Sequence, residues 1–266
     1  MKILILGASG NVGSAITNIL KKKNIDHKTL GSKQNDINID IKKDINSFIQ
    51  IFRNHKYTHI INCLWIRNEQ NLIGNYEHIH KLIISIKNEL KSNNITWIEI
   101  SSIAVNRYEK MGSLKFNKRT YEYQKYLDEY KIKKLLTSNN IKIKILRLAS
   151  IITNSNNHYL KKLNNTTFFN YLFLPGRRQL NINITDQVQL ENKLNYILNT
   201  NFDIVNLYKS YSLDSFLKKY AVSKKLKIIE LQINVLFFKI FLKMINRFKK
   251  FSNFIINVIS FYYKND

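Results

Sequence analysis

The sequence predicts an α/β fold with a doubly wound parallel sheet, and three observations predict it. Residues 3–6 form a short, fully apolar run, which is typical of a strand buried on both faces of a parallel sheet. Closely spaced glycines and a helical pattern of apolar residues follow this run directly. Farther along the chain, short apolar runs alternate with helical patterns, as they do in βαβ units.

The turn after the first strand has the spacing of a dinucleotide-binding motif. Gly7, Gly10 and Gly13 lie three residues apart, and apolar residues at helical spacing follow within 15–20. Gly7 is expected to allow the tight turn, Gly10 to let the backbone approach a pyrophosphate, and Gly13 to let the helix pack closely on the sheet. The N–H groups and the positive end of the helix then face the phosphates. The residues expected to hold the cofactor here are Gly7, Ser9, Gly10, Asn11, Val12 and Gly13.

A plain turn is the alternative interpretation of these glycines. A plain turn needs one glycine, whereas three of the seven glycines in the chain fall within residues 7–13. The spacing therefore favours a nucleotide site.

Residues 27–30 predict a second strand, which ends at Gly31-Ser32-Lys33. In NAD-binding folds an acidic residue near this point, about twenty residues beyond the glycines, holds the ribose hydroxyls. The sequence has Ser32 and Lys33 there, and both side chains suit the 2′-phosphate of NADP. The cofactor is therefore expected to be NAD or NADP, with a slight preference for NADP because Asp36 is also close.

The next elements continue the alternation. Strands are expected at 38–41, 59–64 and 96–100, and amphipathic helices at 45–52 and 79–86. This order again indicates a parallel sheet with helices on both faces.

Candidate catalytic residues follow the strand at 96–100. Ser101 and Ser102 lie at its carboxyl end, which is the edge where open α/β sheets bind ligands. Tyr121 and Lys125 are four residues apart, so they share one face of a helix. A lysine ammonium beside a phenol lowers the pKa of the phenol, and a tyrosine needs this to exchange protons with a sugar hydroxyl near neutral pH.

These residues resemble the extended short-chain dehydrogenase/reductase family, and specifically its NAD-dependent epimerase/dehydratase branch. The resemblance rests on the glycine motif GASGNVG, the Ser-Ser strand end and the Tyr-x-x-x-Lys pair. It implies a Rossmann fold in which Asp40 and Ile41 contact the adenine and Cys63 and Leu64 lie beside the cofactor. Supporting matches extend the resemblance over residues 1–200: Ile145-Leu146-Arg147, Leu174-Pro175-Gly176 and Ile184-Thr185-Asp186.

The resemblance implies an enzyme that transfers hydride between NAD(P) and a nucleotide-linked sugar in surface polysaccharide synthesis. Tyr121 would act as general base or acid, Lys125 would lower its pKa and hold the nicotinamide ribose, and Ser102 would orient the substrate oxygen. Epimerase and reductase both remain open. Dehydratase activity is not expected, because Ile103-Ala104 replaces the Asp-Glu pair of the dehydratases.

A second tyrosine–lysine pair, Tyr130 and Lys134, has the same spacing. The first pair is preferred because the family carries a glutamate four residues after the lysine, which Glu129 matches. The chain also reaches Ser138-Asn139-Asn140, a predicted helix end, soon after Lys134.

Several departures from the family keep a non-catalytic dinucleotide sensor or scaffold protein as the alternative function. Alanines usually stand at the positions of Cys63 and Leu64, a Tyr-Gly pair often stands at Asn106-Arg107, and proline stands at Leu148.

Composition limits the other function classes. The net charge of +25 over 266 residues would suit nucleic acid, but the lysines are spread along the chain and no nucleic-acid-binding motif accompanies them. We therefore expect a small-molecule substrate and no nucleic acid. No histidine or cysteine pattern predicts a metal site. Cys63 is the single cysteine, and no signal peptide or spanning segment is predicted, so a cytoplasmic location is expected.

Two regions are expected: an NAD(P)-binding domain at 1–165 and a small substrate-binding region at 166–266, the latter interleaved with the main sheet or separate from it. Residues 228–263 are rich in Ile, Leu and Phe and are interrupted by basic residues at 239, 243, 247, 249 and 250. This segment either covers the substrate cleft or lies as a basic amphipathic helix on a membrane surface. The family resemblance also implies a homodimer.

Overall fold

The structure is a computed structural model that describes residues 1–31, 35–41, 43–64, 74–111, 120–152, 171–175, 181–212, 215–216, 218 and 227–231. The chain forms two compact units. The first unit comprises 1–151 and 185–208, and the second comprises 152–184 and 209–266.

A seven-stranded sheet forms the centre of the first unit. The strand order is β10-β6-β5-β4-β1-β2-β3, and every neighbouring pair is parallel. This arrangement confirms the predicted doubly wound α/β fold. The strands are β1 (Ile3–Leu6), β2 (His27–Gly31), β3 (Ile37–Asn38), β4 (His59–Asn62), β5 (Thr96–Ser102), β6 (Ile143–Leu148) and β10 (Ile204–Leu207).

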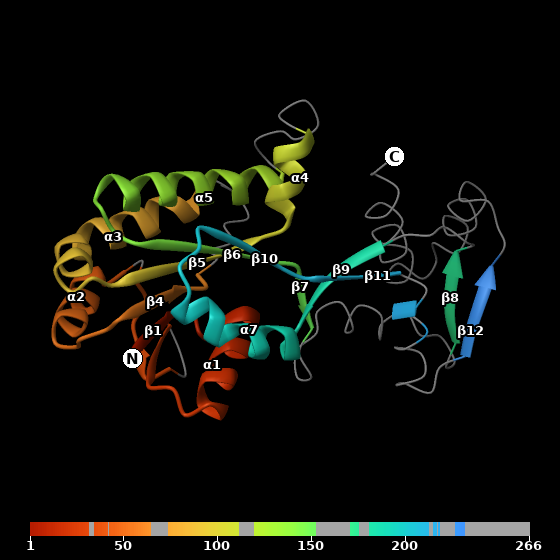
Figure 1. Ribbon diagram of the computed structural model, residues 1–266, viewed down its shortest axis with the longest axis horizontal. Coiled ribbons are helices and arrows are strands. Elements are labelled where there is room, and N and C mark those ends of the chain that lie inside the picture. Colours follow the sequence, from red (N-terminus) through yellow and green to blue (C-terminus); the bar gives the residue numbers. More distant parts are fainter. Residues whose placement is uncertain are drawn as a thin grey trace. The chain divides into compact units, whose positions relative to one another are not determined.

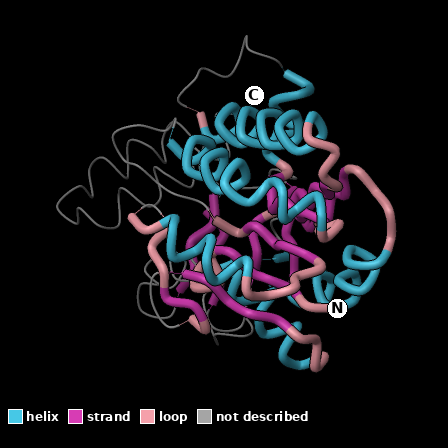
Figure 2. Tube along the Cα trace, turned by 90° about the vertical axis from the view of Figure 1, so that its left-hand side faces the viewer, coloured by secondary structure: helices cyan, strands magenta, loops and turns pink. Residues whose placement is uncertain are grey.

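Helices cover both faces of this sheet, as Figure 1 shows, and Figure 2 shows the strands between the two helical layers. Leu4 and Leu6 of β1 belong to a core cluster with α2, α3 and α5, whereas Ile3 and Ile5 belong to a cluster with α1 and α7. Alternate residues of one strand thus enter opposite cores, as strand geometry requires. The helices are α1 (Asn11–Lys22), α2 (Ile45–Arg53), α3 (Gly74–Ser92), α4 (Ala104–Met111), α5 (Tyr121–Ser138) and α7 (Gln187–Asn199).

Side chains fix the ends of several helices. Asp44 accepts a hydrogen bond from Ser47 N at the start of α2. Asp186 and Gln189 form a capping box at the start of α7, and Thr120 accepts from Tyr123 N at the start of α5. Each cap satisfies an N–H group that has no partner within its own helix.

Lys144 of β6 holds the other end of α7. Its buried ammonium donates to the carbonyl oxygens of Ile197 and Leu198, at 2.9 Å each. A cation placed there satisfies terminal carbonyls and complements the negative end of the helix dipole. The His59 ring contacts the same Leu198 oxygen at 3.2 Å.

Two small sheets complete the described part of the chain. One has the order β11-β9-β7, and the other pairs β12 with β8. Their strands are β7 (Ser150–Ile152), β8 (Tyr171–Pro175), β9 (Asn181–Asp186), β11 (Lys209–Ser212) and β12 (Lys227–Leu231).

Two predicted strands are shorter than expected. The strand predicted at 38–41 is present only at 37–38, where it forms β3, and Asp40 O accepts hydrogen bonds from Lys43 N and Asp44 N in a turn. The strand predicted at 59–64 ends at Asn62. After both strands the apolar residues continue into a loop, and their side chains pack against a core from that loop.

Some expectations fall outside the described residues. These are Ser32 and Lys33, the predicted domain boundary at 165, and the segment 228–263 after residue 231. Among the described residues, no helix is long and apolar enough to span a bilayer.

Candidate functional site

The glycine-rich turn folds tightly against the segment that follows β4. Gly7 has a φ of +73°, which favours glycine, and its N–H donates to Leu30 O at 2.9 Å. A Cβ atom at Gly7 would lie 3.0 Å from both the carbonyl carbon of Cys63 and the nitrogen of Leu64. The structure therefore brings together two segments that the sequence assigns to the cofactor.

Gly13 lies in the first turn of α1 and allows that helix to approach the turn before it. A Cβ atom at this position would lie 2.7 Å from Ala8 Cα and would collide with the Gly7 carbonyl. The close approach was expected against the sheet, but it is made to the turn itself. A Cβ at Gly10 would lie 3.3 Å from the Gly7 oxygen, so Gly10 is less crowded.

The start of α1 is suited to an anion. Ser14 N donates to Gly10 O at 2.8 Å as the helix begins, and the first turn contains no acidic residue. Among the described residues no side chain caps this helix, and Ser9, Gly10 and Asn11 are exposed. Unpaired N–H groups and the positive helix dipole are the features that bind phosphate.

The end of β2 differs from the NAD pattern. Asp36, the first acidic residue after β2 in the sequence, accepts hydrogen bonds from Thr29 N and Thr29 Oγ1, both at 2.8 Å. Partial burial opposes the ionisation of Asp36, but the Thr29 hydrogen bonds and the charge of Lys28 lower its pKa overall. The Asn35 amide lies over Gly31, with Cγ 3.1 Å from where a Cβ would be.

The remaining cofactor candidates lie in loops at the ends of β3 and β4. Asp40 and Ile41 are half-buried, and Ile41 packs against the core beside α2. Cys63 and Leu64 are also half-buried, and they pack against opposite cores. Burial raises the pKa of the Cys63 thiol, as does the charge of Glu99, whereas Lys125 lowers it.

Ser102 ends β5 and begins the turn into α4. Its Oγ accepts a hydrogen bond from Ala104 N at 3.2 Å, and the residue is half-buried. The hydroxyl proton remains available to donate, because the bond to Ala104 uses only a lone pair. The neighbouring Ser101 Oγ is buried and has no hydrogen-bond partner among the described residues.

Tyr121 and Lys125 occupy the first two turns of α5. Tyr121 is 46% exposed, whereas Lys125 is buried at 9% exposure. Burial lowers the pKa of the Lys125 ammonium, and the charges of Glu99 and Asp128 oppose this effect, while Lys125 in turn lowers the pKa of the Cys63 thiol. Lys125 is therefore within electrostatic reach of the segment that touches the glycine-rich turn.

The alternative pair has a different environment. Tyr130 is 54% exposed, and Lys134 is exposed on the same helix. An exposed ammonium is screened by water and shifts a neighbouring phenol less than a buried one does. The two pairs therefore differ in the burial of the lysine: Lys125 is buried, and Lys134 is exposed.

The buried face of α5 begins with polar residues. Four of its six buried side chains are polar, and only the last two turns are apolar. The buried residues are Gln124, Lys125, Asp128, Glu129, Ile132 and Leu136. The first half of α5 therefore covers a layer of buried charge instead of a hydrophobic core.

Glu99 of β5 is part of this layer and was not identified from the sequence. Its Oε2 accepts hydrogen bonds from Asn62 Nδ2 at 2.8 Å and from Trp97 Nε1 at 2.9 Å. Burial raises the pKa of Glu99 to about 7, against the opposing effects of both hydrogen bonds and Lys125. The available signal was an acidic residue inside the otherwise apolar run Trp97-Ile98-Glu99-Ile100.

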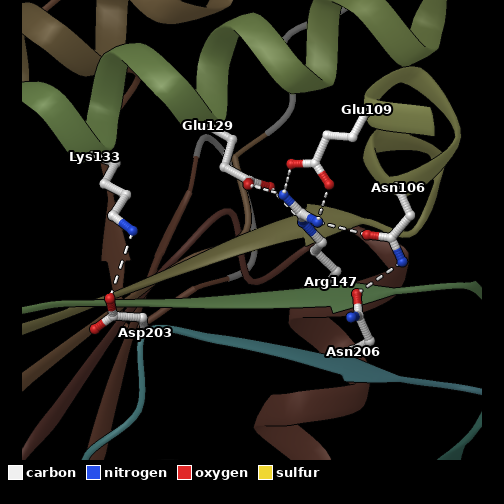
Figure 3. A network of polar contacts seen from close by, with 7 residues as sticks. All are labelled: Asn106, Glu109, Glu129, Lys133, Arg147, Asp203 and Asn206. Atoms are coloured by element: carbon white, nitrogen blue, oxygen red, sulfur yellow. Dashed lines mark hydrogen bonds and ion pairs between the residues drawn. The ribbon is translucent and has the colours of Figure 1, made fainter. Parts of the chain in front are cut away.

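Arg147 of β6 is the centre of a second buried network, which Figure 3 shows. Its guanidinium donates to both oxygens of Glu129, at 2.5 and 3.1 Å, and to both oxygens of Glu109, at 2.7 and 2.9 Å. It also donates to Asn106 Oδ1, and Asn106 Nδ2 donates to Asn206 on β10. The network joins α4, α5, β6 and β10. Within it, Glu129 and Arg147 contact each other, and both residues support the family resemblance.

Comparisons with solved structures find the same fold in a short-chain dehydrogenase/reductase superfamily protein, an epimerase and a reductase. A short-chain dehydrogenase/reductase superfamily protein from Agrobacterium tumefaciens, solved with bound NAD, matches with a TM-score of 0.66 and 13% identity over 87% of this chain and 85% of that chain. A UDP-N-acetylglucosamine 4-epimerase from Bacillus cereus matches with a TM-score of 0.64 and 16% identity, over 87% and 85% of the two chains. A dTDP-4-dehydrorhamnose reductase from Clostridium acetobutylicum matches with a TM-score of 0.63 and 19% identity, over 87% and 84%. These likenesses confirm the fold that the resemblance implied.

Comparisons of the amino-acid sequence give weaker likenesses than the comparisons of structure. No family model matches the chain. A ubiquinone biosynthesis O-methyltransferase from Rickettsia typhi is 26% identical over 167 residues, which is 59% of this chain. The chain spans 61% of the length of that curated relative.

Proposed function

We propose that the protein is an extended short-chain dehydrogenase/reductase that acts as an NAD(P)-dependent epimerase or reductase on a nucleotide-linked sugar, in surface polysaccharide synthesis. The proposal depends on one observation. The segment at Cys63 touches the glycine-rich turn and also lies within electrostatic reach of the buried Lys125, four residues after Tyr121. This supports a single site that combines a dinucleotide cradle with a proton-transfer pair.

The residues at the turn fit a dinucleotide. Gly7 and Gly13 occupy positions that a Cβ would obstruct, and the exposed start of α1 offers N–H groups to a diphosphate. Asp40 and Ile41 would contact the adenine, and Cys63 and Leu64 would lie beside the nicotinamide half. Asp36 already binds Thr29, which supports the slight preference for NADP over NAD.

A bound nicotinamide would supply the hydride acceptor or donor. The chain supplies the proton chemistry: Tyr121 takes a proton from the sugar hydroxyl during oxidation and returns one to the ketone during reduction. The Lys125 ammonium favours the phenolate form of Tyr121. The Ser102 hydroxyl, held by Ala104 N, donates to the substrate oxygen.

Replacing Tyr121 tests the catalytic proposal. Tyr121→Phe should lower turnover at least about 100-fold, because a general acid–base group contributes about that much or more, while dinucleotide affinity is retained. Tyr130→Phe is the matched control and should retain activity. Turnover of nucleotide sugars by the wild type, followed by absorbance of the reduced nicotinamide or by separation of the sugar epimers, gives the readout.

Turnover and the identity of the bound nucleotide also separate the alternative functions. A dinucleotide sensor would bind NAD(P) and show no turnover in any variant. A methyltransferase, as the curated relative is named, would bind S-adenosylmethionine in place of NAD(P). Identification of the nucleotide that co-purifies with the protein distinguishes these outcomes before any substrate is known.

A further inference from the structure

Glu99 is the most deeply placed acidic group of the layer beneath α5. It is 5% exposed and lies opposite Asn62 in the parallel pairing of β4 and β5. Trp97, two residues earlier on the same strand, points to the same face of the sheet. Both neighbours donate to the same carboxylate oxygen, so the Glu99 side chain is held in one orientation.

The charges that act on Glu99 come from α5: the Lys125 ammonium lowers the pKa of Glu99, and the Asp128 carboxylate raises it. Asn62 and Trp97 are neutral donors, so they orient the carboxylate but cannot balance its charge. Lys125 is the cation that acts on Glu99, and Glu99 has the largest charge effect on Lys125.

Lys125 needs such a partner because it is buried. An ammonium removed from water tends to lose its proton, and a neutral lysine does not lower the pKa of a phenol. The carboxylates of Glu99, Asp128 and Glu129 oppose this loss, with Glu99 first among them.

We propose that Glu99 is a positioning residue for the reaction proposed above: its carboxylate, fixed by Asn62 and Trp97, keeps the Lys125 ammonium charged and thereby supports the ionisation of Tyr121. This inference rests on the proposed function for its catalytic consequence. The coupling between Glu99 and Lys125 itself is independent of any substrate. It is also reciprocal, because each charge stabilises the other by the same free energy.

Trp97 provides a direct probe of this coupling. Its indole N–H donates to Glu99, so its ¹H–¹⁵N NMR signal should move when the carboxyl titrates. The chain has two tryptophans, and the variant Trp65→Phe assigns the signal of Trp97. In the wild type the signal should titrate with an apparent pKa of about 7.

Two variants complete the NMR test. In Glu99→Gln the titration should disappear, and in Lys125→Met it should move to higher pH because the stabilising cation is gone. Glu89→Gln, which removes a surface partner of Arg53, should leave the titration unchanged. An equal titration in wild type and Lys125→Met, or an indole signal that stays constant from about pH 5 to about pH 9 in both, would overturn the coupling.

Kinetics then test the catalytic consequence. In Glu99→Gln, Lys125 should lose its proton at lower pH, so the alkaline fall of kcat should begin at lower pH than in the wild type. On that alkaline limb kcat should drop about tenfold for every pH unit by which the onset moves, with KM for the sugar unchanged. An unaltered kcat–pH profile despite a demonstrated coupling would show that Glu99 has no positioning role. Absence of turnover in the wild type would instead contradict the proposed function and leave the NMR result to stand by itself.

Discussion

The Arg147 guanidinium lies between two carboxylates of unequal exposure. The Glu129 side chain is 8% exposed and the Glu109 side chain is 43% exposed, while that of Arg147 is 5% exposed. Burial alone would lower the pKa of Arg147, but the hydrogen bonds to Glu129 and Glu109 raise it, so the residue stays charged. Arg147→Met would leave Glu129 as a buried charge without its partner. We expect it to lower the free energy of unfolding by about 3–5 kcal/mol in urea denaturation.

Arg53→Met is the matched control for this prediction. Arg53 contacts Glu89 at 2.5 Å, but its side chain is 59% exposed. Water screens such a pair, so its loss should cost no more than about 1 kcal/mol. Equal losses in the two variants would mean that the Arg147 network contributes no more than a surface pair does.

The glycines of the turn predict separate effects on folding and on binding. Gly13→Ala places a methyl group against the backbone of Gly7 and Ala8, so it should destabilise the fold by about 1–3 kcal/mol and abolish dinucleotide binding. Gly10→Ala meets only the Gly7 oxygen at 3.3 Å, so it should cost at most about 1 kcal/mol while still weakening dinucleotide affinity. Denaturation and calorimetric titration with NAD(P) measure the two effects. Full affinity in Gly10→Ala would place the diphosphate elsewhere.

At the scale of the element, α5 shows what the sequence pattern could and could not predict. Its end was predictable from the Ser138-Asn139-Asn140 stop, and the spacing of Tyr121 and Lys125 placed both residues on the same helix. Its buried polar face was not, because Lys125, Asp128 and Glu129 look like solvent-exposed helix residues until their partners on β5 and β6 are known. A charged residue enters a core only when other chain segments supply a counter-charge or hydrogen-bond partners, and a periodicity argument within one helix contains no such information.

The strands differ in how well the sequence predicts them. β1, β4 and β5 were predictable because a strand buried on both faces contains a short run of apolar residues. β10 at the edge of the sheet was not predicted. It is only partly buried, with Ile204 38% exposed, so it lacks the long apolar run of a central strand. The turn at Asp40 was mistaken for strand because Ile39 and Ile41 pack on the core from a loop.

Lys144 attaches the end of α7 to the sheet, and it lies outside the candidate site. Lys144→Met removes two hydrogen bonds to the carbonyls of Ile197 and Leu198 and should lower stability by about 1–3 kcal/mol. Amide hydrogen exchange in the last turn of α7 should accelerate more than exchange in its first turn. Lys193→Met, which changes an exposed lysine of the same helix, should leave both unchanged. Uniform exchange across α7 in Lys144→Met would contradict this attachment.

Across the whole molecule, the buried layer beneath α5 has an effect on stability that depends on pH. The pKa of Glu99 is about 7 in the folded chain, above its ordinary value of 4.5. Below about pH 4.5 the carboxyl is protonated whether the chain is folded or not, so its ionisation costs nothing. Between about pH 4.5 and 7 only the unfolded chain releases the proton, so stability falls as the pH rises. Above about pH 7 the full cost is present, and this rise in pKa corresponds to about 3 kcal/mol.

Glu99→Gln keeps an acceptor for Asn62 and Trp97 but removes the ionisation. The difference in unfolding free energy between the variant and the wild type should therefore change by up to about 3 kcal/mol between about pH 4 and pH 8, in favour of the variant at the higher pH. Taking the difference cancels the titrating groups that do not interact with Glu99, since those groups behave alike in both chains. Glu89→Gln should show no such trend, because Glu89 meets Arg53 at the surface. A difference that stays constant with pH would mean that Glu99 is already fully compensated by Lys125, since a compensated carboxylate has no reason to hold its proton near neutrality.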